Sequence, residues 1–456
     1  MKVKMQAPIT KNEKKELTIQ DLSYDGLGVA KVEGYPIFVD NALPGETVEA
    51  LITKVGKSFG FAKTTRIITA SADRVEVKDR QYTQTGIAPL QHLAYGAQLR
   101  FKQQQIENLY AKAKLDIAVK PTLGMTDPTH YRNKASVPVR LINGKATIGF
   151  FRKHSHDLVP MTDFFIQDRK IDAALATLQD IVRRLQIEPY NEFKHSGVLR
   201  NIMVRRGYYT NELMVVFVTR SEKIASKKTL VEMITEEIPD VVSVIQNINP
   251  TKGNAILGKT DKLLYGNAQL RDEVLGLKFD ISAQSFYQVN PQQTQVLYQT
   301  AIDAADLTGD ETVIDAYSGI GTIGLSMAEH VKSVQGVEMV ETAVKDANHN
   351  AKLNNTTNAK FVTGKAEVVM PKWQEEGLSA DIVVVDPPRK GLTPEFINAV
   401  GKVGPSKVIY ISCNPATLAR DLQLFQELGY SAKSTQPVDM FPMTTHIESV
   451  TALTKD

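Results

Sequence analysis

The sequence predicts a multidomain α/β protein with three parts: an OB-like β-barrel at residues 1–70, an α/β region at 71–280 and a doubly wound sheet at 281–456. Length is the first indication, because 456 residues exceed what one hydrophobic core usually organises. The composition, 42% apolar and 23% charged, is typical of globular domains. The third indication is a change of pattern, from short strands with turn signals to strands that alternate with helices.

The first region is predicted to be a small β-barrel. Residues 35–39 and 47–52 alternate apolar and polar side chains, and turn signals such as Asp25-Gly26 separate the strands. About five strands within roughly 60 residues are typical of an OB barrel. Cations and aromatic residues interleave near its end, which suits RNA, although a solvated face beside barrel-core phenylalanines would look the same. These residues are Lys54, Lys57, Phe59, Phe61, Lys63 and Arg66.

The middle region is predicted to be an α/β domain with a basic face. Amphipathic helices are expected at residues 99–115 and 171–185. Residues 130–156 carry six cations and residues 194–207 carry four, and neither stretch holds an acid. Such stretches suit contact with phosphates, although a charge run is more often solvated surface. The cations are Arg132, Lys134, Arg140, Lys145, Arg152, Lys153, Lys194, Arg200, Arg205 and Arg206.

The last region is predicted to form an open, mostly parallel, Rossmann-like sheet with helices on both faces. Apolar, β-branched runs alternate with helical patterns, and ligands of such sheets bind at the carboxyl ends of the strands. The expected strands are 312–316, 333–337, 360–362, 381–385, 407–412, 431–437 and 447–453.

Cys413, the only cysteine of the chain, directly follows one of these strands. Asn414 fits a helix N-cap and Pro415 the first helical position, with the helix expected over residues 416–428. The positive end of a helix stabilises a thiolate, so the sequence predicts a nucleophilic cysteine with a lowered pKa. The alternative is a small buried hydrophobic residue, which is the commoner fate of a lone cysteine.

A glycine-rich turn predicts a second functional element. Gly319, Gly321 and Gly324 match G-x-G-x-x-G after a strand and before a helix, and Glu338 ends the next strand. The glycines permit close backbone approach, and the acid suits ribose hydroxyls. The pattern fits a nicotinamide dinucleotide as well as S-adenosylmethionine, and Asp315 at the end of the first strand favours the cationic ligand.

Three further motifs lie at predicted strand ends or next to the sheet. Asp386-Pro-Pro-Arg-Lys-Gly follows a buried strand and forms a stiff loop, which could also be a simple rigid turn. Glu448 begins the last strand, where an exposed edge glutamate is the alternative. Ser285-Phe-Tyr-Gln-Val-Asn-Pro places two aromatic residues and an amide just before the doubly wound region, for a pocket or for packing.

Taken together, these motifs resemble the RNA uracil-C5 methyltransferase family. The resemblance covers the chain from about residue 15 onward, and the motifs occur in the family's order. The N-terminal barrel resembles the RNA-binding TRAM domain of its ribosomal-RNA members. The matching motifs are Tyr131-Arg-Asn-Lys, Phe286-Tyr-Gln-Val-Asn, Asp315-Ala-Tyr-Ser-Gly-Ile-Gly, Asp386-Pro-Pro-Arg-Lys-Gly, Ser412-Cys-Asn-Pro and His446-Ile-Glu-Ser-Val.

The resemblance implies roles for individual residues. Cys413 would be the nucleophile and Glu448 the base. Phe286, Arg132 and Lys134 would contact the RNA. The helix near residues 95–115 would pack with the catalytic domain. The implied S-adenosylmethionine contacts are Gln288, Tyr317, Glu338, Asp386, Gly319 and Thr322.

The chain departs from several ribosomal-RNA members, which carry cysteines for an iron–sulfur cluster. The corresponding stretch, residues 82–92, holds none, so we expect no cluster and no other metal. One cysteine also excludes an intrachain disulfide, so a cytoplasmic protein is expected. No apolar run approaches the roughly 20 residues of a membrane span. We expect a monomer.

The sequence therefore predicts a methyltransferase that makes 5-methyluridine in 23S ribosomal RNA, at one site or at two. Transfer-RNA uracil-C5 methylation is the first alternative, and the TRAM-like barrel favours ribosomal RNA over it. A non-catalytic RNA-binding ribosome assembly factor is the second, against which the complete set of candidate site residues speaks. A nicotinamide-dependent dehydrogenase is the third.

Overall fold

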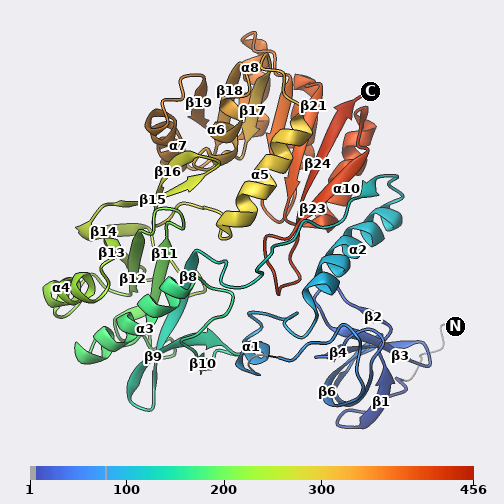
Figure 1. The fold of residues 1–456 in the computed structure, drawn as a ribbon, viewed down its shortest axis with the longest axis vertical. Helices are drawn as coiled ribbons and strands as arrows, with labels where there is room; N and C mark the ends of the chain where they lie inside the picture. Colours follow the sequence, from blue (N-terminus) through green and yellow to red (C-terminus); the bar gives the residue numbers. More distant parts are fainter. Residues whose placement is uncertain (1–6, 78–79) are drawn as a thin grey trace. The chain divides into compact units, whose positions relative to one another are not determined.

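The computed structural model describes residues 7–77 and 80–456 and divides into two compact units (Figure 1). The first unit contains the residues up to Gln105 together with Phe441–His446, and the second contains Ile106–Met440 and Ile447–Asp456. The three expected domains, with boundaries near residues 70 and 280, stay a prediction. No helix within the described ranges is long and apolar enough to cross a membrane.

The first unit begins with a six-stranded sheet in the order β1-β5-β6-β4-β3-β2. Its core comes from alternation: Tyr35, Ile37 and Val39 of β4 are buried, and the residues between them are half-exposed. The strands are β1 (Lys14–Thr18), β2 (Asp21–Leu22), β3 (Gly28–Val32), β4 (Tyr35–Asp40), β5 (Thr47–Val55) and β6 (Gly60–Thr69).

The phenylalanines of this sheet lie outside its buried core. The ring centroids of Phe38, Phe59 and Phe61 are 5.6–5.7 Å apart, and Phe59 is 44% exposed. Lys54 Nζ lies 5.9 Å from the Phe61 centroid. The alternative that Phe59 and Phe61 are barrel-core residues is therefore wrong, and an aromatic and cationic surface remains.

The rest of the first unit is held together by buried polar groups of α2 (Tyr95–Ala113), which follows α1 (Arg80–Thr85). The buried Gln98 side chain donates to the Leu93 carbonyl at 2.8 Å, and its Oε1 accepts from the Met443 amide at 2.9 Å. One turn later Lys102 Nζ donates to the Phe441 carbonyl at 3.0 Å. These bonds fix the Phe441–His446 segment against the start of α2.

The second unit opens with a seven-stranded sheet in the order β10-β9-β8-β11-β12-β13-β14, antiparallel except for β12 and β13. Helix α3 (Arg169–Arg184) covers it and confirms the helix expected at 171–185; the Asp168 side chain caps it by accepting from the Lys170 amide. The other elements are β7 (Ala118–Val119), β8 (Lys134–Ile142), β9 (Lys145–Phe151), β10 (Leu158–Pro160), β11 (Leu199–Arg206), β12 (Leu213–Thr219), α4 (Lys227–Glu237), β13 (Val241–Ile248) and β14 (Thr260–Gly266).

The interpretation of residues 194–207 as a phosphate-facing surface is wrong for two of its four cations. Arg200 is 6% exposed and Arg205 only 2%, and both guanidinium groups donate to backbone carbonyls inside the protein. The two residues lie on β11, which has β8 on one side and β12 on the other. A central strand buries side chains on both faces, and these include the arginines.

The hairpin of β15 (Gln269–Val274) and β16 (Leu277–Ser282) leads to a nine-stranded sheet. Eight of its strands lie in the order β19-β18-β17-β20-β21-β24-β23-β7, and the ninth, β22, pairs with β24. Strands β17 to β21 are parallel to one another, and β24 is antiparallel to β21. The expected Rossmann-like, mostly parallel sheet is confirmed. Its strands are β17 (Thr312–Ala316), β18 (Ser333–Glu338), β19 (Ala359–Thr363), β20 (Ile382–Val385), β21 (Lys407–Ser412), β22 (Tyr430–Ser431), β23 (Ser434–Val438) and β24 (Glu448–Lys455).

Helices enclose this sheet, and one of its faces meets a continuous apolar core. Alternate strand residues such as Val383, Val385 and Tyr410 pack there with Phe396 and Phe425. Ile106 and Tyr110 of α2 belong to the same core. Helix α5 crosses the sheet in Figure 1. The helices are α5 (Pro291–Ala305), α6 (Thr322–Ala328), α7 (Glu341–Leu353), α8 (Ala366–Glu375), α9 (Pro394–Val403) and α10 (Pro415–Glu427).

Candidate active site

Four candidate residues converge on one edge of the nine-stranded sheet. Asp315 is the last but one residue of β17, Asp386 directly follows β20, and Cys413 directly follows β21. Glu448 begins β24, and because β24 is antiparallel to β21, its start meets the carboxyl ends of the parallel strands. The sheet topology thus gathers residues that are separated by up to 133 positions in the sequence.

The local structure around Cys413 follows the sequence prediction. Asn414 is the N-cap of α10 and its Oδ1 accepts from the Ala416 amide at 3.1 Å, with Pro415 at the first helical position. The Asn414 side chain also donates to the Arg389 carbonyl at 2.9 Å. The cap therefore ties the Pro387-Pro388-Arg389 loop to the cysteine.

The predicted lowering of the Cys413 pKa is wrong. The half-buried thiol has its pKa raised to about 12, first by burial and then by the negative charges of Glu448 and Asp386. Arg389 opposes this shift, but its effect is smaller. Two carboxylates and desolvation outweigh the helix N-terminus, so the thiol is protonated at neutral pH.

Glu448 is buried next to this thiol. It is 3% exposed, and its Oε2 has no hydrogen-bond partner among the described residues. Burial, with the charge of Asp386, raises the pKa of Glu448 well above its usual range. The alternative of an exposed edge glutamate is therefore wrong. A raised pKa makes the ionised carboxylate a stronger base, so a buried carboxyl with a free oxygen has the properties of a general base.

Asp386 and Arg389 complete the charged cluster. Burial raises the pKa of Asp386 to about 7. The Arg389 guanidinium lowers the pKa of both Glu448 and Cys413, so it favours their charged forms. Nothing in the sequence gave Arg389 a role within its motif, because only the fold brings it close to Cys413 and Glu448.

The glycine-rich turn has backbone that suits close approach by a ligand. Tyr317, Gly319 and Gly321 have φ values of +65°, +54° and +84°, and a Cβ added at Gly319 would meet nothing within 4 Å. The Gly319 amide donates to Glu338 Oε2 at 3.2 Å, which holds the acid beside the turn. A non-glycine residue in the left-handed region, such as Tyr317, is uncommon and often marks a functional site.

Asp315 holds the helical end of this turn by a hydrogen bond. The buried carboxylate accepts from the Gly324 amide at 2.9 Å, and burial raises its pKa to about 7. Thr322, the first residue of α6, shares a hydrogen bond with the Tyr298 hydroxyl, 3.1 Å away. Burial and the negative charges of Asp386, Asp315 and Glu448 raise the pKa of the Tyr298 hydroxyl on α5. Nothing in the sequence marked Tyr298 as part of this group.

The loop between β16 and α5 carries Phe286 and Gln288. Phe286 is 69% exposed, whereas Gln288 is 5% exposed. The Asn133 side chain donates to the Gln288 carbonyl at 3.2 Å, and its amide donates to the Val289 carbonyl at 2.8 Å. The loop is thus attached to the start of β8, which follows the Tyr131-Arg-Asn-Lys motif.

Arg132 and Lys134 lie on either side of Asn133, both half-buried. Burial lowers the pKa of Lys134 to about 8, with smaller contributions from Arg205 and Arg132. They adjoin the Phe286–Gln288 loop through Asn133, and among the described residues no hydrogen bond or ion pair links them to Cys413.

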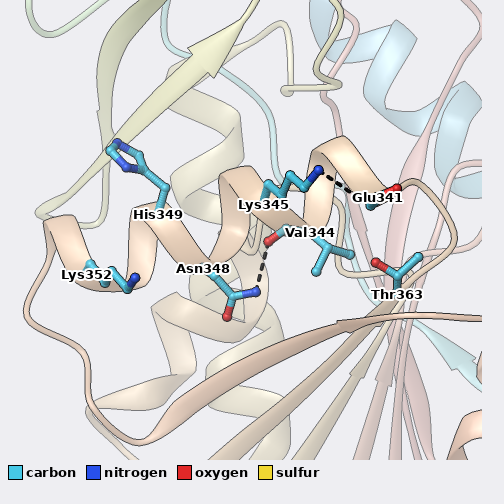
Figure 2. Close-up of a pocket in the computed structure, with 7 residues that line it drawn as sticks. All are labelled: Glu341, Val344, Lys345, Asn348, His349, Lys352 and Thr363. Carbon is cyan, nitrogen blue, oxygen red and sulfur yellow. Dashed lines mark hydrogen bonds and ion pairs between the residues drawn. The ribbon is translucent and has the colours of Figure 1, made fainter.

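A pocket elsewhere in this unit contains none of the predicted site residues. It lies along α7 beside Thr363, where Lys345 pairs with Glu341 and the Asn348 side chain donates to the Val344 carbonyl (Figure 2). The pocket is therefore distinct from the cluster around Cys413.

Within residues 7–77 and 80–456, no group of three or more His, Cys, Asp and Glu side chains could hold a metal ion.

Comparison with known proteins identifies the family. The profile described as tRNA (Uracil-5-)-methyltransferase matches residues 94–456, and the TRAM domain profile matches residues 8–65. The chain belongs to the tRNA (uracil-5-)-methyltransferase family. It is an RNA methyltransferase with an N-terminal TRAM domain, as the motifs predicted.

Similar proteins cover the whole chain. An RNA methyltransferase of Enterococcus faecalis is 55% identical over 450 residues, 98% of each chain, and one of Lactiplantibacillus plantarum is 54% identical over 456 residues, 100% of each chain. The crystal structure of Pyrococcus abyssi tRNA (uracil-54, C5)-methyltransferase in complex with S-adenosyl-L-homocysteine is similar at a TM-score of 0.78, with 26% identity. That match covers 96% of this chain and 100% of the other.

Proposed function

We propose that this protein methylates C5 of uridine in RNA with S-adenosylmethionine as the methyl donor, and that its RNA is 23S ribosomal RNA. The observation that carries the proposal is the cluster of Cys413, Asp386 and Glu448 at one sheet edge, with a buried, unpartnered carboxylate oxygen beside the chain's only thiol. The complex of the archaeal relative with S-adenosyl-L-homocysteine supports the choice of donor.

The glycine-rich turn fits the donor. Gly319 exposes backbone with open space at its Cα, and Glu338 stands beside it to accept hydrogen bonds from ribose hydroxyls. Tyr317 and Gln288 would orient the rest of the molecule, Thr322 would adjoin it, and Asp386 would face its cationic centre. When bound, S-adenosylmethionine supplies an electrophilic methyl group on a sulfonium sulfur.

The chemistry requires a nucleophile that activates the base. Uracil C5 is a weak nucleophile, and addition of the Cys413 thiolate to C6 makes C5 enolate-like, so that C5 can take the methyl group. Because the pKa of the free thiol is raised, its proton must leave when the substrate binds. The Asp386 carboxylate can receive this proton, which leaves Glu448 ionised for the later step, and Arg389 stabilises the resulting thiolate.

The second half of the reaction requires a base. After methylation C5 still carries its proton, and Glu448 removes it; the electron pair then expels the Cys413 sulfur from C6 and restores the uracil ring. The free Oε2 of Glu448 is available for this proton. The proton on Glu448 returns to the Cys413 sulfur, and the proton taken earlier from the thiol is released to solvent. Each turnover therefore returns the thiol and leaves 5-methyluridine.

The target base must leave its stack to reach this edge, which costs a few kcal/mol and favours an unpaired loop. The exposed Phe286 ring offers a stacking surface for it. Arg132 and Lys134 would hold the adjacent phosphates, and Phe59 with Lys54 on the TRAM domain would contact further RNA.

Transfer RNA is the second candidate substrate. The archaeal relative, named as a transfer-RNA enzyme, is matched over 96% of this chain, so the TRAM domain by itself does not separate the two substrates. Mass-spectrometric mapping of 5-methyluridine in ribosomal and transfer RNA decides between them. We expect a deletion strain to lose the modification from 23S RNA, and loss from transfer RNA alone would overturn that choice.

A trapping experiment tests the chemistry. RNA with 5-fluorouridine at the target position should form a stable covalent complex, because fluorine cannot leave C5 as a proton does. Cys413→Ala should form no complex. Full methylation by Cys413→Ala would exclude the mechanism, and absence of S-adenosylmethionine binding would favour the non-catalytic RNA-binding alternative.

A further inference from the structure

Arg205 occupies an unusual position beside the candidate site. It lies near the end of β11 and is among the largest side chains that are fully buried in the described part of the chain. Its Nη1 donates to the Ser282 carbonyl at 3.1 Å and its Nη2 to the Ser285 carbonyl at 2.9 Å. Both acceptors belong to the turn that leads directly to Phe286.

These two hydrogen bonds fix the orientation of peptide groups. Because a peptide unit is planar, a bond to the Ser285 carbonyl also orients the amide of Phe286. On the other side of the loop, Asn133 holds the carbonyls of Gln288 and Val289. Arg205 and Asn133 thus anchor the loop before and after the two residues with proposed ligand contacts.

The turn also has hydrogen bonds of its own, since the Ser285 amide donates to the Ser282 carbonyl at 3.3 Å and to its hydroxyl at 3.2 Å. The Ser285 hydroxyl lies 2.6 Å from that of Ser282 and donates to Asp346 at 2.9 Å. These bonds orient side chains, whereas the carbonyls of Ser282 and Ser285 point at the guanidinium. Arg205 therefore joins both ends of the turn to the seven-stranded sheet, and the Gln284 side chain adds one bond from the middle of the turn to Asp261 of β14 at 2.8 Å.

The burial of Arg205 is energetically demanding. Among the described residues no carboxylate pairs with it and its Nε has no hydrogen-bond partner, and burial lowers its pKa to about 10. Burying a cation without an acid destabilises a fold unless hydrogen bonds compensate. The hydrogen bonds to the Ser282 and Ser285 carbonyls provide this compensation, so the burial of Arg205 is linked to the anchoring of the loop.

We infer that Arg205 is a positioning residue that holds the Ser282–Asn290 loop so that Phe286 and Gln288 meet the uracil and the methyl donor. This inference rests on the proposed function for the roles of those two residues. Arg205 itself touches neither ligand; it acts through the two carbonyls.

Arg205→Met removes the two hydrogen bonds and keeps most of the side-chain volume, and Arg205→Lys retains the charge but can reach only one carbonyl well. Arg200→Met is the matched control. Arg200 is on the same strand, is similarly buried, and donates to the carbonyls of Asn249 and Thr251, which belong to a different loop. The control therefore removes the same kind of interaction at a comparable loss of stability.

Hydrogen exchange and ligand binding are measured on the full-length chain. In Arg205→Met, amides of residues 283–290 should exchange faster, S-adenosyl-L-homocysteine should bind about tenfold more weakly, and kcat/KM should fall about 10- to 100-fold. Arg205→Lys should have an exchange rate, an affinity and a kcat/KM between those of Arg205→Met and the wild type. Arg200→Met should exchange faster only around residues 249–253 and bind the ligand normally.

Two outcomes would overturn the inference. One is a folded Arg205→Met or Arg205→Lys with wild-type exchange and affinity, and the other is an equal loss of binding in Arg200→Met. If Arg205→Met does not fold, the lysine variant decides. A wild-type chain that fails to bind S-adenosyl-L-homocysteine would instead overturn the proposed function, and normal wild-type binding separates the two cases.

Discussion

Cys413 and Glu448 face each other at the point where the ladder between β21 and β24 ends. Ser412 and Ser449 form its last registered pair, and Cys413 and Glu448 are the next residue on each strand. Opposite residues of an antiparallel pair project to the same face. The chain's only thiol and a buried carboxyl group are therefore neighbours by strand register. Burial raises the pKa of both groups, and the charge of Glu448 raises that of Cys413 further.

Glu448→Gln should stop the reaction after methyl transfer. Without a base at C5, the Cys413–C6 bond cannot break, so a methylated protein–RNA adduct should accumulate on unmodified RNA, and turnover should fall by about 10²- to 10⁴-fold. Denaturing gels with a radiolabelled methyl donor measure both. Glu427→Gln, an exposed glutamate at the end of α10, should behave as wild type. An adduct that also forms with Cys413→Ala would refute the assignment.

The reactivity of Cys413 should rise far into the alkaline range. A thiol with a pKa of about 12 is still mostly protonated at pH 9.5, whereas a free cysteine of pKa about 8.5 is mostly thiolate there. Because the chain has no other cysteine, the rate of iodoacetamide alkylation against pH reports this thiol alone. Glu448→Gln removes a nearby negative charge, so it should shift the profile to lower pH. An alkylation rate that reaches its plateau below pH 8 would show that the pKa of Cys413 is lowered and not raised.

Asp172 should make the second unit less stable as pH rises. Its carboxyl is buried in the first turn of α3, accepts from the Phe164 amide at 3.1 Å, and has its pKa raised to about 8, mainly by burial. A raised folded-state pKa contributes stability below the unfolded value near 4, and this contribution is lost as pH rises through 8. The free energy of unfolding of Asp172→Asn should therefore rise relative to that of the wild type by at least about 1 kcal/mol between pH 5 and pH 9.

Urea unfolding at pH 5, 7 and 9 checks this expectation. Asp180→Asn serves as its control, since Asp180 lies on the same helix but is mostly exposed and pairs with Arg184. Parallel pH profiles for the wild type and Asp172→Asn would contradict the raised pKa.

Local patterns sufficed for much of this fold and failed where distant strands meet. The strands at 312–316 and 407–412 and the Asn414–Pro415 helix start depend on neighbouring residues, and all were predictable. The pKa of Cys413 was not, because the carboxylates of Asp386 and Glu448 reach it only through strand order. Arg205 was counted as a surface cation for a similar reason: a short basic strand does not reveal that sheet neighbours cover it on both sides.

Lys134 should make RNA binding sensitive to pH. Its pKa of about 8 in the free protein means that part of its charge is lost between pH 7 and pH 9. A phosphate bound beside it would favour the charged form, so binding takes up a proton in this range and affinity should fall as pH rises. Lys134→Met should weaken binding at pH 7, remove most of this pH dependence, and lower the salt slope by about 1.

Filter binding of a target-site RNA at pH 7, 8 and 9 and several salt concentrations measures these quantities. Lys145→Met is the matched control, because Lys145 belongs to the same acid-free stretch but its side chain is exposed at the start of β9. That variant should keep the wild-type pH dependence even if its salt slope falls. If Lys134→Met and wild type lose affinity equally between pH 7 and pH 9, the half-buried ammonium does not contact phosphate, and the RNA path must avoid the start of β8.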